Sequence, residues 1–251
     1  PWQAANLREM RRGWMHATAL PADLVEARSK AGVACEIAWR EARPKSDFAG
    51  ITGLLAEVLR LETEAAEIKA EALDCTPYDA LLDQYSPGID TATVERTFAQ
   101  LTEFLPDFIQ AVIERQATHP APALPKGPFP LATQREVGMR FMAALGFDFE
   151  GGRLDVSTHP FSGGTPDDLR ITTRYDEDDF ATGLMGILHE TGHALYERGL
   201  PKDWRLAPVG TARGMDIHES QSLLIEMQAC RSKPFIDYAA PILKDAFGGS
   251  G

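Results

Sequence analysis

Residues His189, Glu190, Thr191, Gly192 and His193 form an HExxH motif. Residues four apart lie on one face of an α-helix, so both imidazole rings can reach one metal ion. Glu190 lies one position further round the helix, where its carboxylate can touch a water on the metal without binding the metal itself. The pattern therefore predicts hydrolysis by a metal-activated water, with Glu190 taking up the proton. The alternative is a solvated helix face that carries two histidines by chance.

A catalytic zinc site needs a third protein ligand and one open position. Glu219, in segment 214–228, is the first candidate. Glu226 lies seven residues later and nearly on the same face of a predicted helix, and is the runner-up. A glutamate on a helix is usually only a solvated charge. Glu226 would serve equally well as a hydrogen-bond acceptor for a ligand histidine. The residues alone leave this choice open.

The elements around the motif are predicted from their end signals. Acidic residues at 176–179 favour a helix start, and Gly199 and Pro201 favour its end, so a helix is expected over 180–198. A second helix is expected over about 216–231. Two strand-like runs, in 150–161 and at 169–174, are separated by the turn residues of 162–168. We expect these two runs to pair as a small antiparallel hairpin.

The first half of the chain is predicted to be nearly all helix. Apolar residues recur at helical spacing up to about residue 119, which favours four or five antiparallel helices. Thr76 and Asp90 have the side chains of helix N-caps. The proline-rich segment 120–130 cannot continue a helix and is the expected boundary, and a further helix is expected over 133–145, ending at Gly146.

Composition excludes several classes of function. The chain has 251 residues and a formal charge of −12, which disfavours nucleic acids and anionic membranes as partners. It has no apolar run of the roughly 20 residues that a membrane span needs. The cysteines, Cys35, Cys75 and Cys230, form no CxxC pair, so we expect a reducing, cytoplasmic location. The sequence contains no GxSxG, P-loop or GxGxxG motif.

Four motifs in order make the sequence recognisable: HPF at 159–161, D-x-R-x-T-T-R at 168–174, HETGHALYERG at 189–199 and GMDIHESQS at 214–222. Together they closely resemble the M32 family of metallocarboxypeptidases, the carboxypeptidase Taq type. The resemblance implies a mainly α fold, with a small β-hairpin or sheet next to the HExxH helix, and a homodimer with a long groove. It also implies release of C-terminal amino acids from peptides with zinc or cobalt. Residues 1–130 would then form a helical cleft wall and residues 131–251 the metal-binding catalytic region.

The resemblance also assigns roles to single residues. It makes Glu219 the third ligand beside His189 and His193, and Glu190 the general base. His159 and His218 lie inside family motifs and would line the cleft, although a histidine hydrogen-bonded in the core is an alternative. An exopeptidase needs a cation for the substrate's terminal carboxylate. The candidates are Arg170, Arg174 and Arg213, and the alternative is that they pair with acids such as Asp168 or Asp176.

The sequence departs from the family in its extent. Family members continue through an I-R-x-x-A-D and a G-x-x-Q-D-x-H-W segment, and neither occurs here. We therefore expect a central fragment of a longer enzyme, weakly active by itself and prone to oligomerise. Two other functions are kept as alternatives: a helical HExxH oligopeptidase that cuts internal bonds, and a non-catalytic helical interaction module.

Overall fold

The fold is mainly helical and has one small sheet next to the helix of the HExxH motif, as predicted. The computed structural model describes residues 1–157 and 159–248. These form two compact units, Pro1–Ile109 and Gln110–Gly251. The division by role, with a cleft wall over 1–130 and a metal-binding region over 131–251, stays a prediction.

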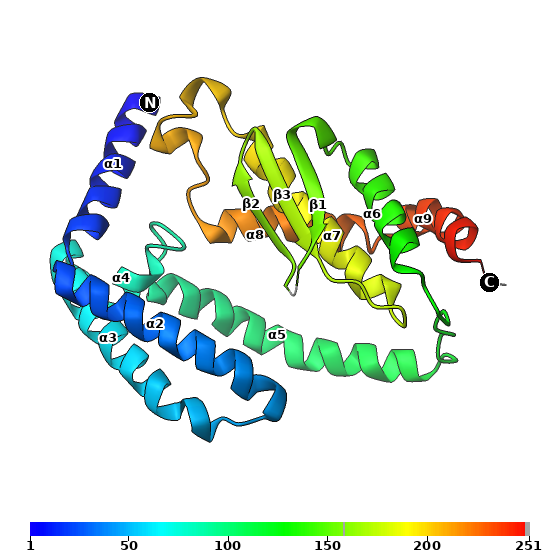
Figure 1. The fold of residues 1–251 in the computed structure, drawn as a ribbon, viewed down its shortest axis with the longest axis horizontal. Coiled ribbons are helices and arrows are strands. Elements are labelled where there is room, and N and C mark those ends of the chain that lie inside the picture. Colours follow the sequence, from blue (N-terminus) through cyan, green and yellow to red (C-terminus); the bar gives the residue numbers. More distant parts are fainter. Residues whose placement is uncertain (158, 249–251) are drawn as a thin grey trace. The chain divides into compact units, whose positions relative to one another are not determined.

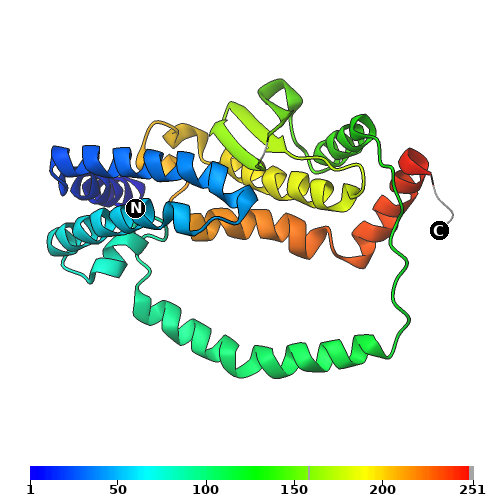
Figure 2. The ribbon, with the colours of Figure 1, turned by 60° about the horizontal axis from the view of Figure 1, so that its bottom comes forward.

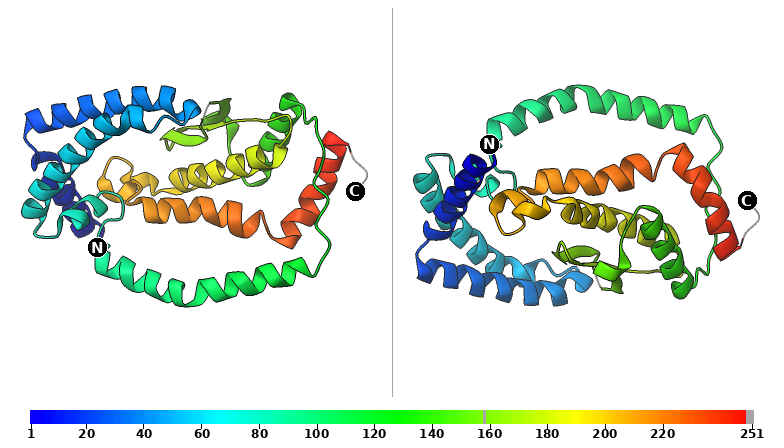
Figure 3. Two further views of the ribbon diagram at one scale, coloured as in Figure 1. Left: turned by 90° about the horizontal axis from the view of Figure 1, so that it is seen from below. Right: turned by 90° about the horizontal axis from the view of Figure 1, so that it is seen from above.

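The first unit is built from helices (Figure 1). Its helices α2 (Ala22–Ala42) and α3 (Ala49–Leu73) lie side by side (Figure 3), around a core of Leu24, Leu61 and Ala65. Both predicted caps are confirmed, since Thr76 accepts a hydrogen bond from the Asp79 amide and Asp90 accepts one from the Thr93 amide. The helices are α1 (Trp2–Thr18), α2 (Ala22–Ala42), α3 (Ala49–Leu73), α4 (Pro77–Leu82) and α5 (Thr91–Ala117), which continues past the unit boundary.

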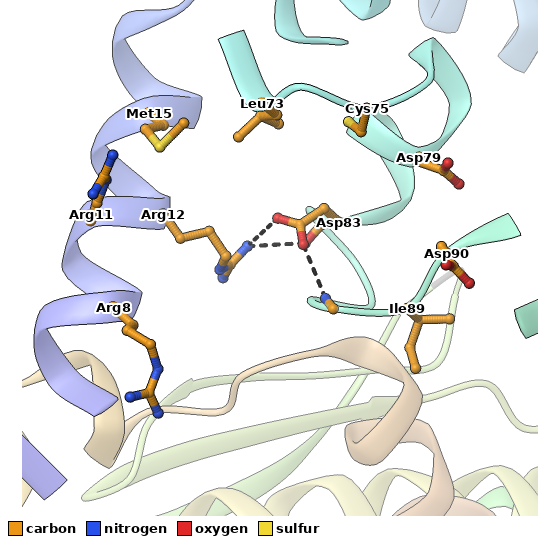
Figure 4. A pocket seen from close by; sticks show the side chains of 11 residues that line it. Arg8, Arg11, Arg12, Met15, Leu73, Cys75, Asp79, Asp83, Ile89 and Asp90 are labelled. Carbon is orange, nitrogen blue, oxygen red and sulfur yellow. Dashed lines mark hydrogen bonds and ion pairs between the residues drawn. The ribbon is translucent and has the colours of Figure 1, made fainter. Parts of the chain in front are cut away.

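An open cavity of about 510 Å³ is lined by residues of the first unit. On one wall Arg12 reaches from α1 to the carboxylate of Asp83, which follows α4 (Figure 4). Asp83 also accepts hydrogen bonds from His16 Nε2 at 2.8 Å and from the Gly88 amide at 3.0 Å. Asp83 therefore joins α1 to the segment after α4. None of the residues of the HExxH motif, or of the HES motif at 218–220, lines this cavity.

The second unit is organised around the helix of the HExxH motif, α7 (Phe180–Gly199). Asp179 caps it by accepting hydrogen bonds from the amides of Ala181 and Thr182. The sheet packs on α7, while α8 (Met215–Leu223) runs beside it (Figure 2). The other elements are α6 (Leu131–Ala144), β1 (Gly152–Val156), β2 (Phe161–Thr165), β3 (Asp168–Thr173), α8 (Met215–Leu223) and α9 (Lys233–Phe247), with short 3-10 turns at Arg43–Lys45, Phe149–Gly151, Lys202–Trp204 and Pro208–Gly210.

The apolar faces of α7 divide between two cores. On one side Leu184 and Leu188 pack with residues of α6 and α9, including Phe141 and Ile242. On the other side Ile187 packs against side chains of the sheet. Because α7 is buried on both sides, its position is set by most of the second unit, and the histidines that it carries are held on a rigid element.

The prediction of one antiparallel hairpin is wrong. The two predicted strands, β1 and β3, do pair, but in parallel, and β2 lies antiparallel on the other edge of β3. The expected turn residues Gly163 and Gly164 are in fact part of β2. A Cβ atom at Gly164 would lie 2.0 Å from the Asp168 carbonyl oxygen, so glycine here permits a close strand approach rather than a turn.

The second predicted helix is continuous but changes type. Residues 215–223 are α-helical as α8, and Leu224–Ala229 follow as a π-helical run, η5. Such runs often lie near functional sites, and this one carries Glu226.

Candidate metal centre

The close approach of α7 and α8 builds the site. At Gly192 a Cβ atom would lie 2.6 Å from the Ser222 Cα and 2.7 Å from the Gln221 carbonyl oxygen. Gly192 lies between the two histidines of the motif, and Glu219 lies one turn before Ser222. The missing side chain at residue 192 therefore lets α8 bring Glu219 opposite both rings.

Three side chains converge there. The Nε2 atom of His189 lies 3.7 Å from Glu219 Oε1, and the Nε2 atom of His193 lies 3.3 Å from Glu219 Oε2. Three potential ligand atoms lie within 4.8 Å of one another, one each from His189, His193 and Glu219. Two imidazole nitrogens and one carboxylate oxygen are a donor set that suits zinc with an open position. The residues present therefore fit a divalent metal.

The other ring nitrogens of the histidines face the protein. His189 Nδ1 lies 3.1 Å from Glu226 Oε2. His193 Nδ1 lies 2.6 Å from His218 Nδ1, and His218 Nε2 lies 2.9 Å from Glu197 Oε1. The two glutamates left open by the sequence thus lie on different sides of the rings: Glu219 faces Nε2 atoms, and Glu226 faces an Nδ1 atom.

The sequence interpretation missed Glu197. Its position was a usable signal, because residue 197 lies four after His193 and hence on the same face of α7. What it could not reveal is that His218, from another helix, lies between the two side chains.

Glu190 is placed differently from the three converging residues. It is 8% exposed, and it is outside the group whose ligand atoms converge. Burial raises the pKa of Glu190; the nearby imidazole of His189 opposes this effect and the Glu219 carboxylate adds to it. A raised pKa favours a carboxyl group that both takes up and returns a proton near neutral pH.

His193 is also perturbed by its surroundings. Burial lowers the pKa of its imidazole, and the neighbouring rings of His218 and His189 lower it further. Its neutral form is therefore favoured, and a neutral imidazole has the lone pair that a metal ligand requires.

The remaining predicted site residues are not part of the group whose ligand atoms converge. His159 is exposed, and its carbonyl oxygen accepts a hydrogen bond from the Thr172 hydroxyl. Arg170 is exposed and pairs with Asp168 at 2.7 Å, which is the alternative considered for it. Arg174 is exposed, and no hydrogen bond or ion pair of its side chain is found within the described residues. Arg213 is exposed just before α8.

Comparisons with known proteins place the chain among peptidases. The family model described as "Carboxypeptidase Taq (M32) metallopeptidase" matches residues 2–251. The "Thermostable carboxypeptidase 1" of Thermus thermophilus is 38% identical over 257 residues, which cover 99% of this chain and 50% of that protein. The solved structure of Trypanosoma cruzi metallocarboxypeptidase 1 superposes with a TM-score of 0.93 at 42% identity, covering 99% of this chain and 50% of that one.

A further solved structure, the Pyrococcus furiosus carboxypeptidase titled "Apo-Mg", superposes with a TM-score of 0.87 at 33% identity, over 95% of this chain and 48% of that one. The chain thus spans about half the length of the relatives that it matches. Among the described residues, no helix combines the length and the apolar character that crossing a bilayer would require.

Proposed function

Because the chain belongs to the carboxypeptidase Taq (M32) family of metallopeptidases, we propose that the protein is a metal-dependent carboxypeptidase. His189, His193 and Glu219 hold one divalent metal, and Glu190 is the general base. The observation that carries this proposal is the convergence of two Nε2 atoms on the Glu219 carboxylate. A bound cation would stabilise this arrangement, since two ring lone pairs would otherwise face an anionic carboxylate.

Zinc is the metal proposed, with cobalt as a second possibility, because the donor set combines nitrogen and oxygen. When bound, such a metal would act as a Lewis acid, lowering the pKa of a bound water to near neutral and polarising the substrate carbonyl. Glu190 then accepts the proton of the attacking water and delivers it to the leaving amine. Its burial and its freedom from hydrogen bonds within the described residues support this role.

Release of the C-terminal residue needs a group that recognises the terminal carboxylate. Of the predicted arginines, Arg170 is already neutralised by Asp168, whereas Arg174 has no such partner among the described residues. Arg174 is therefore the better candidate for a guanidinium that binds this carboxylate in two-point geometry. His159 stays a candidate for the cleft lining.

Homodimer formation and a cytoplasmic location remain part of the proposal. The first rests on the family resemblance, and the second on the sparse, unpaired cysteines. Sedimentation of the complete gene product tests the first directly.

The test of the activity uses two versions of one peptide and the complete gene product loaded with zinc or cobalt. The unblocked peptide should yield a ladder shortened from its C-terminus in mass spectra, and the C-terminal amide should be cut slowly or not at all. Internal fragments from the amide would instead support the oligopeptidase alternative. Absence of metal binding and of hydrolysis would leave the interaction module.

A further inference from the structure

The two proposed ligand histidines are anchored by unlike partners. His189 has a carboxylate, Glu226, directly on its Nδ1 atom. His193 instead has a second imidazole, His218, which in turn contacts the carboxylate of Glu197. Neither Glu197 nor the contact between the two rings belongs to the catalytic set proposed above.

The Glu197 carboxylate determines which ring nitrogens of His218 and His193 carry a proton. An ionised carboxylate only accepts hydrogen bonds, so His218 Nε2 must be the donor in the 2.9 Å contact. A neutral His218 ring then has its lone pair on Nδ1, and His193 Nδ1 must donate across the 2.6 Å contact. The lone pair of His193 is therefore left on Nε2, the atom that faces Glu219.

The same reasoning applies to His189 with one step fewer. Glu226 Oε2 accepts from His189 Nδ1, which leaves the lone pair on the Nε2 atom that faces Glu219. Glu226 is held in turn, because its other oxygen accepts a hydrogen bond from Arg231 at 2.6 Å. Its side chain is only 16% exposed, so solvent competes weakly for these contacts.

We infer that Glu226, and Glu197 acting through His218, are positioning residues that hold both ligand histidines in the Nδ1–H tautomer and aim both Nε2 lone pairs at the metal position. The inference rests on the proposed metal site. It also assigns His218 a position behind His193, so that the histidine of the HES segment acts through a ligand rather than on substrate.

The two ligand histidines differ in how strongly their Nδ1 hydrogen-bond partners hold them. His189 donates to an anion directly, whereas His193 donates to a neutral ring that is polarised by an anion beyond it. Loss of such outer partners typically lowers metal affinity about 10- to 100-fold. Replacing Glu197 should therefore weaken metal binding, although the Glu197 side chain touches neither the metal position nor Glu219.

The first test needs no metal. Long-range ¹⁵N–¹H spectra of the metal-free chain, recorded above the histidine titration range, report the tautomer of each ring. We expect Nδ1–H for His189 and His193 and Nε2–H for His218, although histidines in water favour Nε2–H. An Nε2–H form of His193, or a doubly protonated His218, would overturn the inference.

The second test measures zinc affinity by competition with a chelator for Glu197→Gln, Glu226→Gln and His218→Ala. Each should bind about 10- to 100-fold more weakly than the unmodified chain. Asp216→Asn is the matched control. It removes one negative charge near Glu197, since the carboxylates of Glu197 and Asp216 both raise the pKa of Tyr196. It breaks neither the contact of Glu197 with His218 nor that of Glu226 with His189. Its affinity should stay within about threefold.

The outcomes separate this inference from the proposed function. If the unmodified chain binds no zinc, or if His193→Ala binds as tightly as the unmodified chain, the proposed metal site itself fails. If zinc binds through these residues but Glu197→Gln and Glu226→Gln match Asp216→Asn, only the positioning role is refuted. A variant that fails to fold leaves the tautomer spectra of the unmodified chain to decide.

Discussion

Replacing Gly192 by alanine should separate the two helices that form the proposed metal centre. The new Cβ would lie 2.6 Å from the Ser222 Cα, 2.7 Å from the Gln221 carbonyl oxygen and 3.1 Å from the Ser222 amide nitrogen. All three are backbone atoms, so no side chain can turn away. Carbon atoms pack at about 3.5–4.0 Å, and α8 must therefore retreat by about 1 Å.

A shift of this size would disrupt metal coordination but would change the free energy of unfolding only modestly. Glu219 is carried on α8 and would move away from His189 and His193, whereas metal–ligand distances tolerate only about 0.2 Å. We expect zinc affinity to fall by more than the roughly 100-fold upper range for loss of an outer partner. Overpacking costs about 1–3 kcal/mol, and alanine regains about 1 kcal/mol of helix propensity, so the variant should lose only about 0–2 kcal/mol and remain folded.

Gly186→Ala on the same helix is the matched control. Its Cβ would meet only Pro160 Cγ at 3.8 Å and Thr173 Oγ1 at 3.9 Å, which are ordinary contacts. It should gain up to about 1 kcal/mol of stability and keep its zinc affinity. Chelator competition and denaturant unfolding measure both quantities. Unchanged zinc affinity in Gly192→Ala would refute the reasoning that this close approach positions Glu219.

Three further predictions concern single carboxylates. Glu219→Ala should abolish stoichiometric zinc binding, measured by metal analysis after dialysis, while Glu226→Ala only weakens it; the reverse result would exchange their roles. Glu190→Gln in the complete gene product should keep its metal and lose about 10²- to 10⁴-fold in kcat, and a loss of less than tenfold would contradict a general base. Burial raises the pKa of Asp83, but hydrogen bonds from His16, Gly88 and Arg12 outweigh it, so the folded-state pKa lies below the ordinary 3.8. The stability from Asp83 is thus present above pH 3.8 and lost as the pH falls through the folded-state pKa; Asp83→Asn should lower the Tm at pH 7 and weaken its acid dependence, and identical Tm–pH curves would argue against this.

Local structure followed closely from local sequence. Thr76, Asp90 and Asp179 cap helices as their side chains predict, and Gly146, with φ of +94°, ends α6. These features depend on a few neighbouring residues. The sheet was predicted less well, because β1 pairs with β3 across an intervening strand, β2. In addition, β2 contains two glycines, which are also typical of a turn.

For the proposed metal centre, the sequence by itself determined the HExxH pair on one helix face, the position of Glu190 beside it, and two glutamates able to complete the set. Helix periodicity is enough for this, because it relates residues within one helix. Only the tertiary structure decided that Glu219 faces the Nε2 atoms, that Glu226 lies on His189 Nδ1, and that His218 links His193 to Glu197. Those contacts depend on the register between α7 and α8, which is set by the backbone approach of Gly192 to Ser222 and cannot be read from the periodicity of either helix alone.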